Sequence, residues 1–158
     1  MPADVAVEHL SVEAYTIPTD APEADGTASW TSTTIVVVHA EAGGMRGLGY
    51  SYTGASAAAL IAGKLAAVAV GRDAMDPPAA WRALQVAVRN IGREGMAATA
   101  ISAVDVALWD LKARLLDCPL ANLLGRYRDR VAIYGSGGFT SYDERMLAPQ
   151  LSVWVDQQ

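Results

Sequence analysis

The chain has 158 residues, of which 52% are hydrophobic and 18% charged, and its formal net charge is −5 with a sequence pI near 4.9. This composition is that of a folded globular protein and excludes a disordered one. Nucleic acids and anionic membranes attract basic surfaces, so the acidic balance argues against binding to either.

Three further features concern the compartment. The first ten residues lack a basic stretch followed by an apolar core, which argues against a secretory signal. The longest apolar stretch, Ala55 to Val70, contains Lys64 and is too short to span a bilayer. Cys118 is the only cysteine, so no internal disulfide can form. We therefore expect a cytoplasmic protein.

The first third of the chain predicts a three-stranded antiparallel sheet. One strand with an irregularity runs from Val5 to about Ile17, and Thr16 to Trp30, with its prolines and acidic residues, is predicted to be a loop. The β-branched run Thr33 to Ala40 predicts a second strand. Gly43 and Gly44 then supply a hairpin turn to a third strand at Arg46 to Tyr52.

Two helices are predicted next. The alanine-rich segment Ser56 to Val70 can be capped by Ser56 or its neighbours, and Gly71 ends it. Asp76 is a suitable N-cap for a helix that begins at two prolines and runs to about Ile91.

The stretch from Ala100 to Phe139 predicts a helix and a strand. Apolar residues at steps of three and four form one stripe, while Val106 and Trp109 lie off it and call for a second neighbour. Pro119 ends the helix. Val131 to Tyr134 is a β-prone run that leads into a glycine-rich loop. The stripe consists of Ile101, Val104, Leu108, Leu111 and Leu115.

A last helix is predicted near the C-terminal end. Ser141 with Glu144 three positions later is typical of a capping box. Pro149 lies deep in this helix and predicts a kink or a restart.

The order Ser102 to Lys112, then Pro119, Leu123-Leu124-Gly125 and Arg130-Val131, resembles the mandelate racemase and muconate lactonizing group of the enolase superfamily. The resemblance covers nearly the whole chain. It implies an α+β fold: a three-stranded antiparallel sheet followed by a helical bundle as a capping domain over residues 1–125. Residues 126–158 would then be the first strand and helix of an incomplete (β/α) barrel.

The resemblance also implies where the chemistry lies. Enzymes of this superfamily remove a proton from the carbon next to a carboxylate, with a Lys or His base and Mg²⁺ to stabilise the ene-diolate. In the family the base belongs to a Lys-x-Lys type motif on the second barrel strand, and the metal ligands lie on later strands. Lys64 and Lys112, the only lysines, belong to no such motif. We expect no catalytic residue, metal ligand or cofactor in this chain, and Mg²⁺ only in the full-length family.

Other titratable residues favour structural roles. Asp105 and Asp110 are five residues apart on one helix and point in different directions, so they cannot chelate one ion. Asp110 is an i,i+4 partner of Arg114, and Asp105 is expected beside Lys112 or a backbone group. His9 and His39 lack further ligands at metal-binding spacing. Cys118 has no basic neighbour and is expected to be a packing residue.

In the family, one loop between the first two strands and another after the third close over the barrel mouth and contact substrate. Here they correspond to Thr16–Trp30 and Tyr50–Ser56, and an equally good interpretation of Trp30 and Tyr52 is packing on the sheet. Ser136 follows the predicted barrel strand, where a flexible loop is favoured and a substrate contact is possible. The candidate substrate contacts are Ile17, Pro18, Trp30, Tyr52, Thr53 and Ser136.

Two functions remain open at this point. The first is the capping, substrate-specificity part of a Mg²⁺-dependent racemase, cycloisomerase or sugar-acid dehydratase, inactive by itself and binding a small carboxylate substrate only once a barrel completes it. The alternative is a self-standing, non-catalytic α+β association module. In either case a homo-oligomer is possible, because a two-faced helix and a lone strand leave apolar surface to cover.

Overall fold

The computed structural model describes residues 5–157. Their helices and strands, in chain order, are β1 (His9–Ala24), β2 (Ser29–Ala42), β3 (Met45–Tyr52), α1 (Ala55–Leu60), the π-helical turn η1 (Ile61–Leu65), α2 (Ala66–Ala69), α3 (Pro77–Ala87), α4 (Met96–Leu115), α5 (Leu120–Leu123) and α6 (Glu144–Asp156). They divide into two compact units. The sheet unit contains the chain up to Thr16 together with Thr34–Arg126, and the hairpin-tip unit contains Ile17–Thr33 together with the chain from Tyr127 onward.

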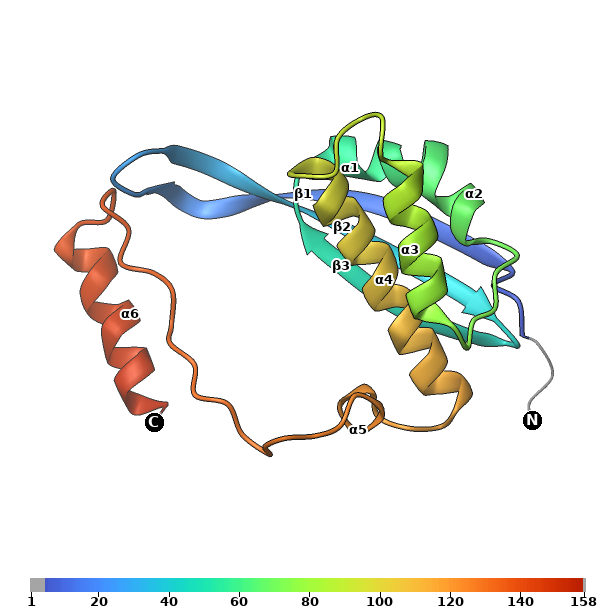
Figure 1. Cartoon of the computed structure of the whole chain (residues 1–158). Coiled ribbons are helices and arrows are strands. Elements are labelled where there is room, and N and C mark those ends of the chain that lie inside the picture. The colour runs from blue at the N-terminus through green and yellow to red at the C-terminus, as the bar shows by residue number, and fades with distance from the viewer. Residues whose placement is uncertain (1–4, 158) are drawn as a thin grey trace. The chain divides into compact units, whose positions relative to one another are not determined.

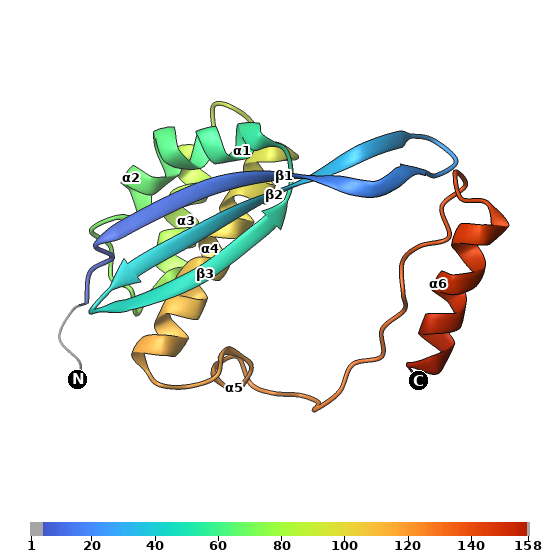
Figure 2. The same ribbon diagram turned by 180° about the vertical axis from the view of Figure 1, so that it is seen from behind.

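The sheet has three strands in the order β1-β2-β3, and β2 pairs with β3 antiparallel, as predicted. Within the sheet unit, helices α1 to α4 lie on one face of this sheet (Figure 1), and the view from behind shows the other face with none of these helices across it (Figure 2). The predicted turn is confirmed: Gly43 and Gly44 both have positive φ, which two-residue hairpins of the type I′ class require.

Helix α4 lies unusually close to strand β3. A Cβ atom added at Gly49 would lie 2.1 Å from the backbone oxygen of Ala103, and one at Gly47 would lie 2.3 Å from that of Ala107. Only glycine leaves room for a helix backbone at these two positions. On α4 itself, the backbone atoms nearest these glycines belong to Ala103, Ala107 and Leu111. The two elements therefore pack backbone against backbone.

A single core fills the space between the sheet and the helices. Its buried members come from strands β1 and β2, from the segment just before β1 and from helices α1 to α4, and no polar or charged residue among those described is fully buried. The largest fully buried side chains are Ile61, Leu65, Leu84, Ile101, Leu108 and Leu111.

The prediction that α4 has two neighbours is confirmed, but the second buried face differs from the predicted one. α4 contacts β3 as well as α1 and α3. The side toward the sheet is formed by small residues such as Ala103 and Ala107, both fully buried. Of the two residues that the sequence suggested for this role, Val106 is 39% exposed and Trp109 is half-buried. Small side chains carry little hydrophobic signal, yet they are what allows the close approach.

Asp110 joins α4 to the edge of the sheet. Its Oδ2 accepts a hydrogen bond of 2.8 Å from the backbone N–H of Leu48 on β3 and another of 2.8 Å from Nε of Arg114. The Arg114 pair was predicted from the i,i+4 spacing, and the Leu48 contact was not. Because β3 is an edge strand, Asp110 satisfies an N–H that no neighbouring strand can reach.

Some helix boundaries differ from those predicted. The first helix begins after Gly54 with no side-chain cap, so the expected capping by Ser56 is wrong, and a π-helical turn interrupts it at Ile61–Leu65. Asp76 caps α3 as expected, accepting from the N–H of Ala79 at 3.1 Å. α3 ends at Ala87 instead of near Ile91.

The hairpin-tip unit corrects two further predictions. Thr16 to Trp30 is not a loop: β1 continues to Ala24 and β2 begins at Ser29, which leaves only a short turn. Val131 to Tyr134 is not a strand, and Ile133 and Tyr134 are about nine-tenths exposed. A strand requires a neighbour for its backbone hydrogen bonds, and this segment has none among the described residues.

Helix α6 also differs from its prediction. Its N-cap is Asp143, whose side chain accepts from the N–H of Met146 at 3.0 Å, and Ser141 bonds elsewhere. Pro149 lies inside one continuous helix, so no restart occurs there. Gln150 accepts a hydrogen bond from the N–H of Gly138 at 3.0 Å, which attaches α6 to the preceding segment.

Asp105 on α4 is partly buried and makes no hydrogen bond or ion pair with any described residue. The expected contact of its carboxylate with Lys112 or a backbone group is wrong: neither is made, and the Nζ of Lys112 lies 5.1 Å from the ring centroid of Trp109. Burial raises the pKa of Asp105, since desolvation penalises the carboxylate form. None of the helices in the described part is long and apolar enough to cross a membrane.

We predict that Gly49→Ala destabilises the protein by about 3 kcal/mol or more, because the new methyl group meets helix backbone that cannot move aside. Gly63→Ala is the matched control, since nothing lies within 4 Å of a Cβ at that position. The control should be neutral or stabilising by up to about 1 kcal/mol. Urea unfolding measures both, and equal midpoints for Gly49→Ala and the wild type would contradict the close approach.

We also predict that Asp105→Asn stabilises the protein at neutral pH. The folded-state pKa of Asp105 is raised, so ionisation costs stability, and that cost appears as the pH rises from the unfolded pKa through the folded pKa. The difference between variant and wild type should therefore be small at low pH and grow toward pH 7. Thermal melting across this range checks the prediction, and a difference that shrinks with rising pH would show that Asp105 is favourably paired.

Candidate functional site

The structure distributes the six candidate substrate contacts over both units. Ile17, Pro18, Trp30 and Ser136 belong to the hairpin-tip unit, although Ser136 is more than a hundred residues from the others in sequence. Tyr52 and Thr53 belong to the sheet unit.

The hairpin ends in a turn built around Asp25. One carboxylate oxygen of Asp25 accepts hydrogen bonds from the N–H of Thr27 at 2.6 Å, the hydroxyl of Thr27 at 2.8 Å and the N–H of Ala28 at 2.8 Å. These bonds, led by the one from the Thr27 N–H, hold the pKa of Asp25 below its usual value. This carboxylate therefore serves the turn, which replaces the predicted loop.

Trp30 lies at the start of β2 and is held from two sides. Its Nε1 donates a 2.6 Å hydrogen bond to Glu23 on β1. Its ring meets Phe139 edge to face, with centroids 5.6 Å apart, and Phe139 meets Tyr142 in the same way at 5.4 Å. Such edge-to-face pairs are a favoured aromatic geometry. Trp30 thus packs on an aromatic cluster formed with residues 139 and 142.

Sequence reasoning missed the residues of this cluster and their neighbours. The N–H of Thr140 donates to the carbonyl oxygen of Ala24 at 2.9 Å, its hydroxyl donates to the same oxygen at 3.0 Å, and the hydroxyl of Ser141 donates to that of Pro22 at 2.6 Å. The only available signal was the pair of aromatic residues at 139 and 142. Their partners lie more than a hundred positions earlier, beyond the reach of local patterns.

The remaining candidates differ in how free their side chains are. Ile17 is 53% exposed, Pro18 and Ser136 are exposed, and Ser136 makes no hydrogen bond with the described residues. Tyr52, opposite Ile35 in the register, is 72% exposed. These side chains have surface left for a ligand.

Thr53 is engaged in the sheet unit. Its hydroxyl lies 3.0 Å from that of Thr99, and its N–H donates to the carbonyl oxygen of Thr34 at 3.2 Å. If the Thr53 hydroxyl contacted a substrate, it would have to do so while also bonded to the Thr99 hydroxyl.

The described residues do not form a Mg²⁺ site. Among residues 5–157, no three His, Cys, Asp or Glu side chains come together in a way that could hold a metal ion. His9 pairs with Glu41, with Nδ1 and Oε2 4.0 Å apart. Hard divalent cations need several oxygen ligands around one point.

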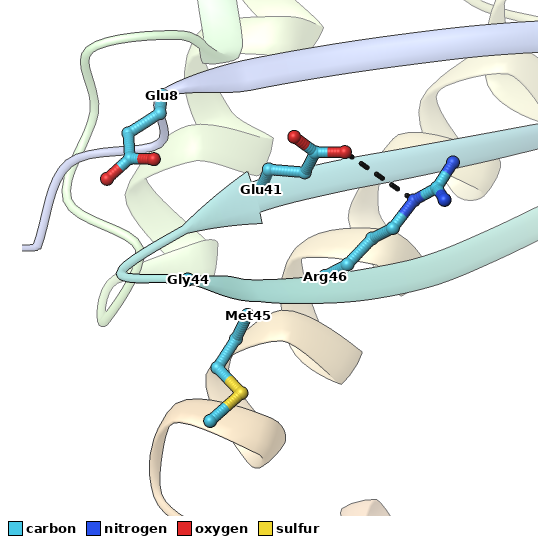
Figure 3. Close-up of a pocket in the computed structure, with 5 residues that line it drawn as sticks. All are labelled: Glu8, Glu41, Gly44, Met45 and Arg46. Carbon is cyan, nitrogen blue, oxygen red and sulfur yellow. Dashed lines mark ion pairs between the residues drawn. The ribbon is translucent and has the colours of Figure 1, made fainter.

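A hollow of about 260 Å³ lies beside the β2–β3 turn and is polar. Glu41 pairs with Arg46 across the two strands at 3.5 Å, and Glu8 stands at the start of β1 (Figure 3). Glu8 accepts from the N–H of Gly43 at 3.1 Å. The charged groups already bind one another or the turn, which gives them a structural role.

A second hollow, of about 530 Å³, belongs to the hairpin-tip unit. It is lined by Ile133, Tyr134, Gly135, Trp154 and Gln157. Its lining is mainly apolar and includes no group that could act as a general base at neutral pH.

Comparison with known proteins places these observations in a family. The N-terminal domain model of mandelate racemase / muconate lactonizing enzyme matches residues 11–125. The crystal structure of a mandelate racemase/muconate lactonizing enzyme-like protein from Rubrobacter xylanophilus is 56% identical, has a TM-score of 0.92 and covers 96% of this chain. That of L-talarate/galactarate dehydratase from Salmonella typhimurium LT2 is 30% identical, with a TM-score of 0.88 over 98% of this chain.

Curated relatives agree. L-talarate/galactarate dehydratase from Salmonella typhimurium is 42% identical over 100 residues, 61% of this chain, and 3,6-anhydro-alpha-L-galactonate cycloisomerase from Streptomyces coelicolor is 35% identical over 137 residues, 83% of this chain. A mutant L-talarate/galactarate dehydratase has been solved with Mg and L-glucarate.

The match covers only part of the length of these relatives. This chain spans 25% and 38% of these two curated relatives and 42% of each of the two solved chains. It has the three-stranded sheet and helices of their N-terminal capping domain. The chain belongs to the mandelate racemase / muconate lactonizing enzyme family, whose N-terminal domain it carries at residues 11–125.

Proposed function

We propose that this chain is the substrate-specificity part of a Mg²⁺-dependent enzyme that removes the proton next to the carboxylate of a sugar acid or related small acid. The observation that carries the proposal is the family match over residues 11–125, to relatives that include sugar-acid dehydratases and cycloisomerases. In this proposal the base and the metal ligands come from a barrel, and this chain contributes the side chains that close over its mouth.

Two features of the chain support a capping role. The described residues include no group of three His, Cys, Asp or Glu that could hold a metal ion, which supports assigning the metal to the barrel. Several candidate contacts are exposed, apolar or aromatic side chains, among them Ile17 and Tyr52. Apolar side chains that close over a site exclude water and strengthen the electrostatic interactions inside it. In the proposed enzyme these residues select the distal end of the substrate and do not take part in proton transfer.

The acidic hairpin supports separate roles for the barrel and for this capping chain. Asp20, Glu23 and Asp25 make the hairpin a poor binding place for a carboxylate group. The carboxylate next to the reacting carbon would therefore face Mg²⁺ in the barrel, and the hydroxyl-bearing carbons of the substrate would face the cap.

We predict that a chimera carrying this chain in place of the matching part of the Salmonella dehydratase dehydrates galactarate or L-talarate when Mg²⁺ is present. In the active chimera, Tyr52→Ala should raise KM about tenfold, the usual cost of losing one apolar substrate contact. Trp81→Ala, another exposed aromatic residue outside the two candidate loops, is the matched control.

Steady-state kinetics on both acids measure these effects. A chimera that folds and binds Mg²⁺ but has no activity would favour the alternative, a self-standing association module. Equal KM values for Tyr52→Ala and Trp81→Ala would remove Tyr52 from the substrate site.

We also predict that the 158-residue chain by itself does not bind Mg²⁺ stoichiometrically and does not catalyse the reaction, because no described cluster of oxygen ligands is present. Isothermal titration with MgCl₂ checks the binding, with the full-length Salmonella dehydratase as the positive control. A saturable heat signal with one ion per chain would overturn the assignment of the metal to the barrel.

A further inference from the structure

The tip of the β1–β2 hairpin is attached to residues 139–142 through backbone, hydroxyl and aromatic contacts. All of them lie inside the hairpin-tip unit. They involve the outer edge of β1 and the ring of Trp30, and none belongs to a metal site or to a base. Their role is therefore to hold the hairpin tip in place.

The backbone part of the attachment follows from strand order. β1 is an edge strand of the sheet, so its outward carbonyl groups have no strand partner. The carbonyls of Pro22 and Ala24 are two residues apart and so point to the same side of the strand. Thr140 and Ser141 reach these two carbonyls with consecutive hydroxyl groups, at 3.0 Å and 2.6 Å, and the N–H of Thr140 adds a third bond at 2.9 Å.

The aromatic part fixes a candidate substrate contact. Phe139 stands between Trp30 and Tyr142 and meets both rings edge to face. On the other side, the indole N–H of Trp30 is bonded to Glu23. Loss of solvent around Tyr142, with the charges of Glu23 and Asp20 adding to it, raises the pKa of its phenol, which agrees with close packing here. Trp30 thus has little freedom to turn while Phe139 is in place.

We propose that Phe139, Thr140 and Ser141 are positioning residues, which fix the hairpin tip and the Trp30 ring relative to the segment that carries Ser136. The consequence for catalysis rests on the proposed function, in which Trp30 and Ser136 contact the same substrate. The attachment of the hairpin tip to residues 139–142 does not depend on the proposed function. The three residues act through Trp30 and touch no reacting atom.

The test is made on the 158-residue chain. The double variant Thr140→Val/Ser141→Ala removes both hydroxyl donors, and Phe139→Leu removes the ring. Ser152→Ala is the matched control, because Ser152 is an exposed serine on α6 that bonds to no described residue. The four tryptophans give four indole N–H signals in a ¹H–¹⁵N spectrum, and Trp30→Phe identifies the signal of Trp30.

In both test variants, hydrogen exchange of the Trp30 indole and of the amides in residues 23–30 should accelerate at least about tenfold, as expected when local opening is no longer opposed by these contacts. Amides of α4 and the control should keep their wild-type rates. Thr140→Ser and Phe139→Tyr should preserve slow exchange, because they retain the hydroxyl and the ring. Unchanged Trp30 exchange in the double variant and in Phe139→Leu would overturn the proposal.

A second measurement separates this inference from the proposed function. In the active chimera, Thr140→Val/Ser141→Ala should raise KM for the sugar acid at least about fivefold and change kcat less, since a mobile Trp30 weakens binding more than chemistry. A loosened hairpin with unchanged KM would refute the positioning role while leaving the capping function intact. An inactive chimera would count against the capping function alone, because hydrogen exchange still decides whether the attachment exists.

Discussion

The contact of the α4 backbone with strand β3 is the constraint on which the sheet unit depends. Gly47 and Gly49 leave space that the backbone of α4 at Ala103, Ala107 and Leu111 occupies. The same helix also contacts α1 and α3. Close packing of this kind tolerates little change in volume, because the atoms in contact belong to two backbones.

The same geometry explains the polar contact at the sheet edge. A helix held against an edge strand brings its own side chains within reach of the strand's unpaired backbone groups, and Asp110 uses this to accept from the N–H of Leu48. The hairpin-tip unit solves the equivalent problem on β1 with Thr140 and Ser141. In both units, side chains from distant parts of the chain satisfy an exposed strand edge, which stabilises the sheet and discourages pairing with other strands.

Local patterns predicted the elements well where the hydrogen-bond partners lie within the element or across a tight turn. The three strands, the glycine turn, the Asp76 cap and the long helix before Pro119 all follow from spacing and turn chemistry. The prediction was wrong for Thr16–Trp30, because prolines and acids on an edge strand resemble a loop. It was wrong for Val131–Tyr134 because β-branched residues indicate a strand that needs a partner to form. The substrate roles of the six candidate residues stay predictions.

The sequence by itself determined most of the elements, because hydrophobic periodicity and glycine turns are local properties of the chain, and its resemblance to a known group of enzymes indicated the family. Tertiary structure alone decided which alanines face the sheet, that Asp110 reaches Leu48, and that Phe139, Thr140 and Ser141 contact a hairpin more than a hundred residues away. The physical reason is that these contacts depend on distances between backbones. Such distances are set by packing the whole unit, and no local pattern encodes them.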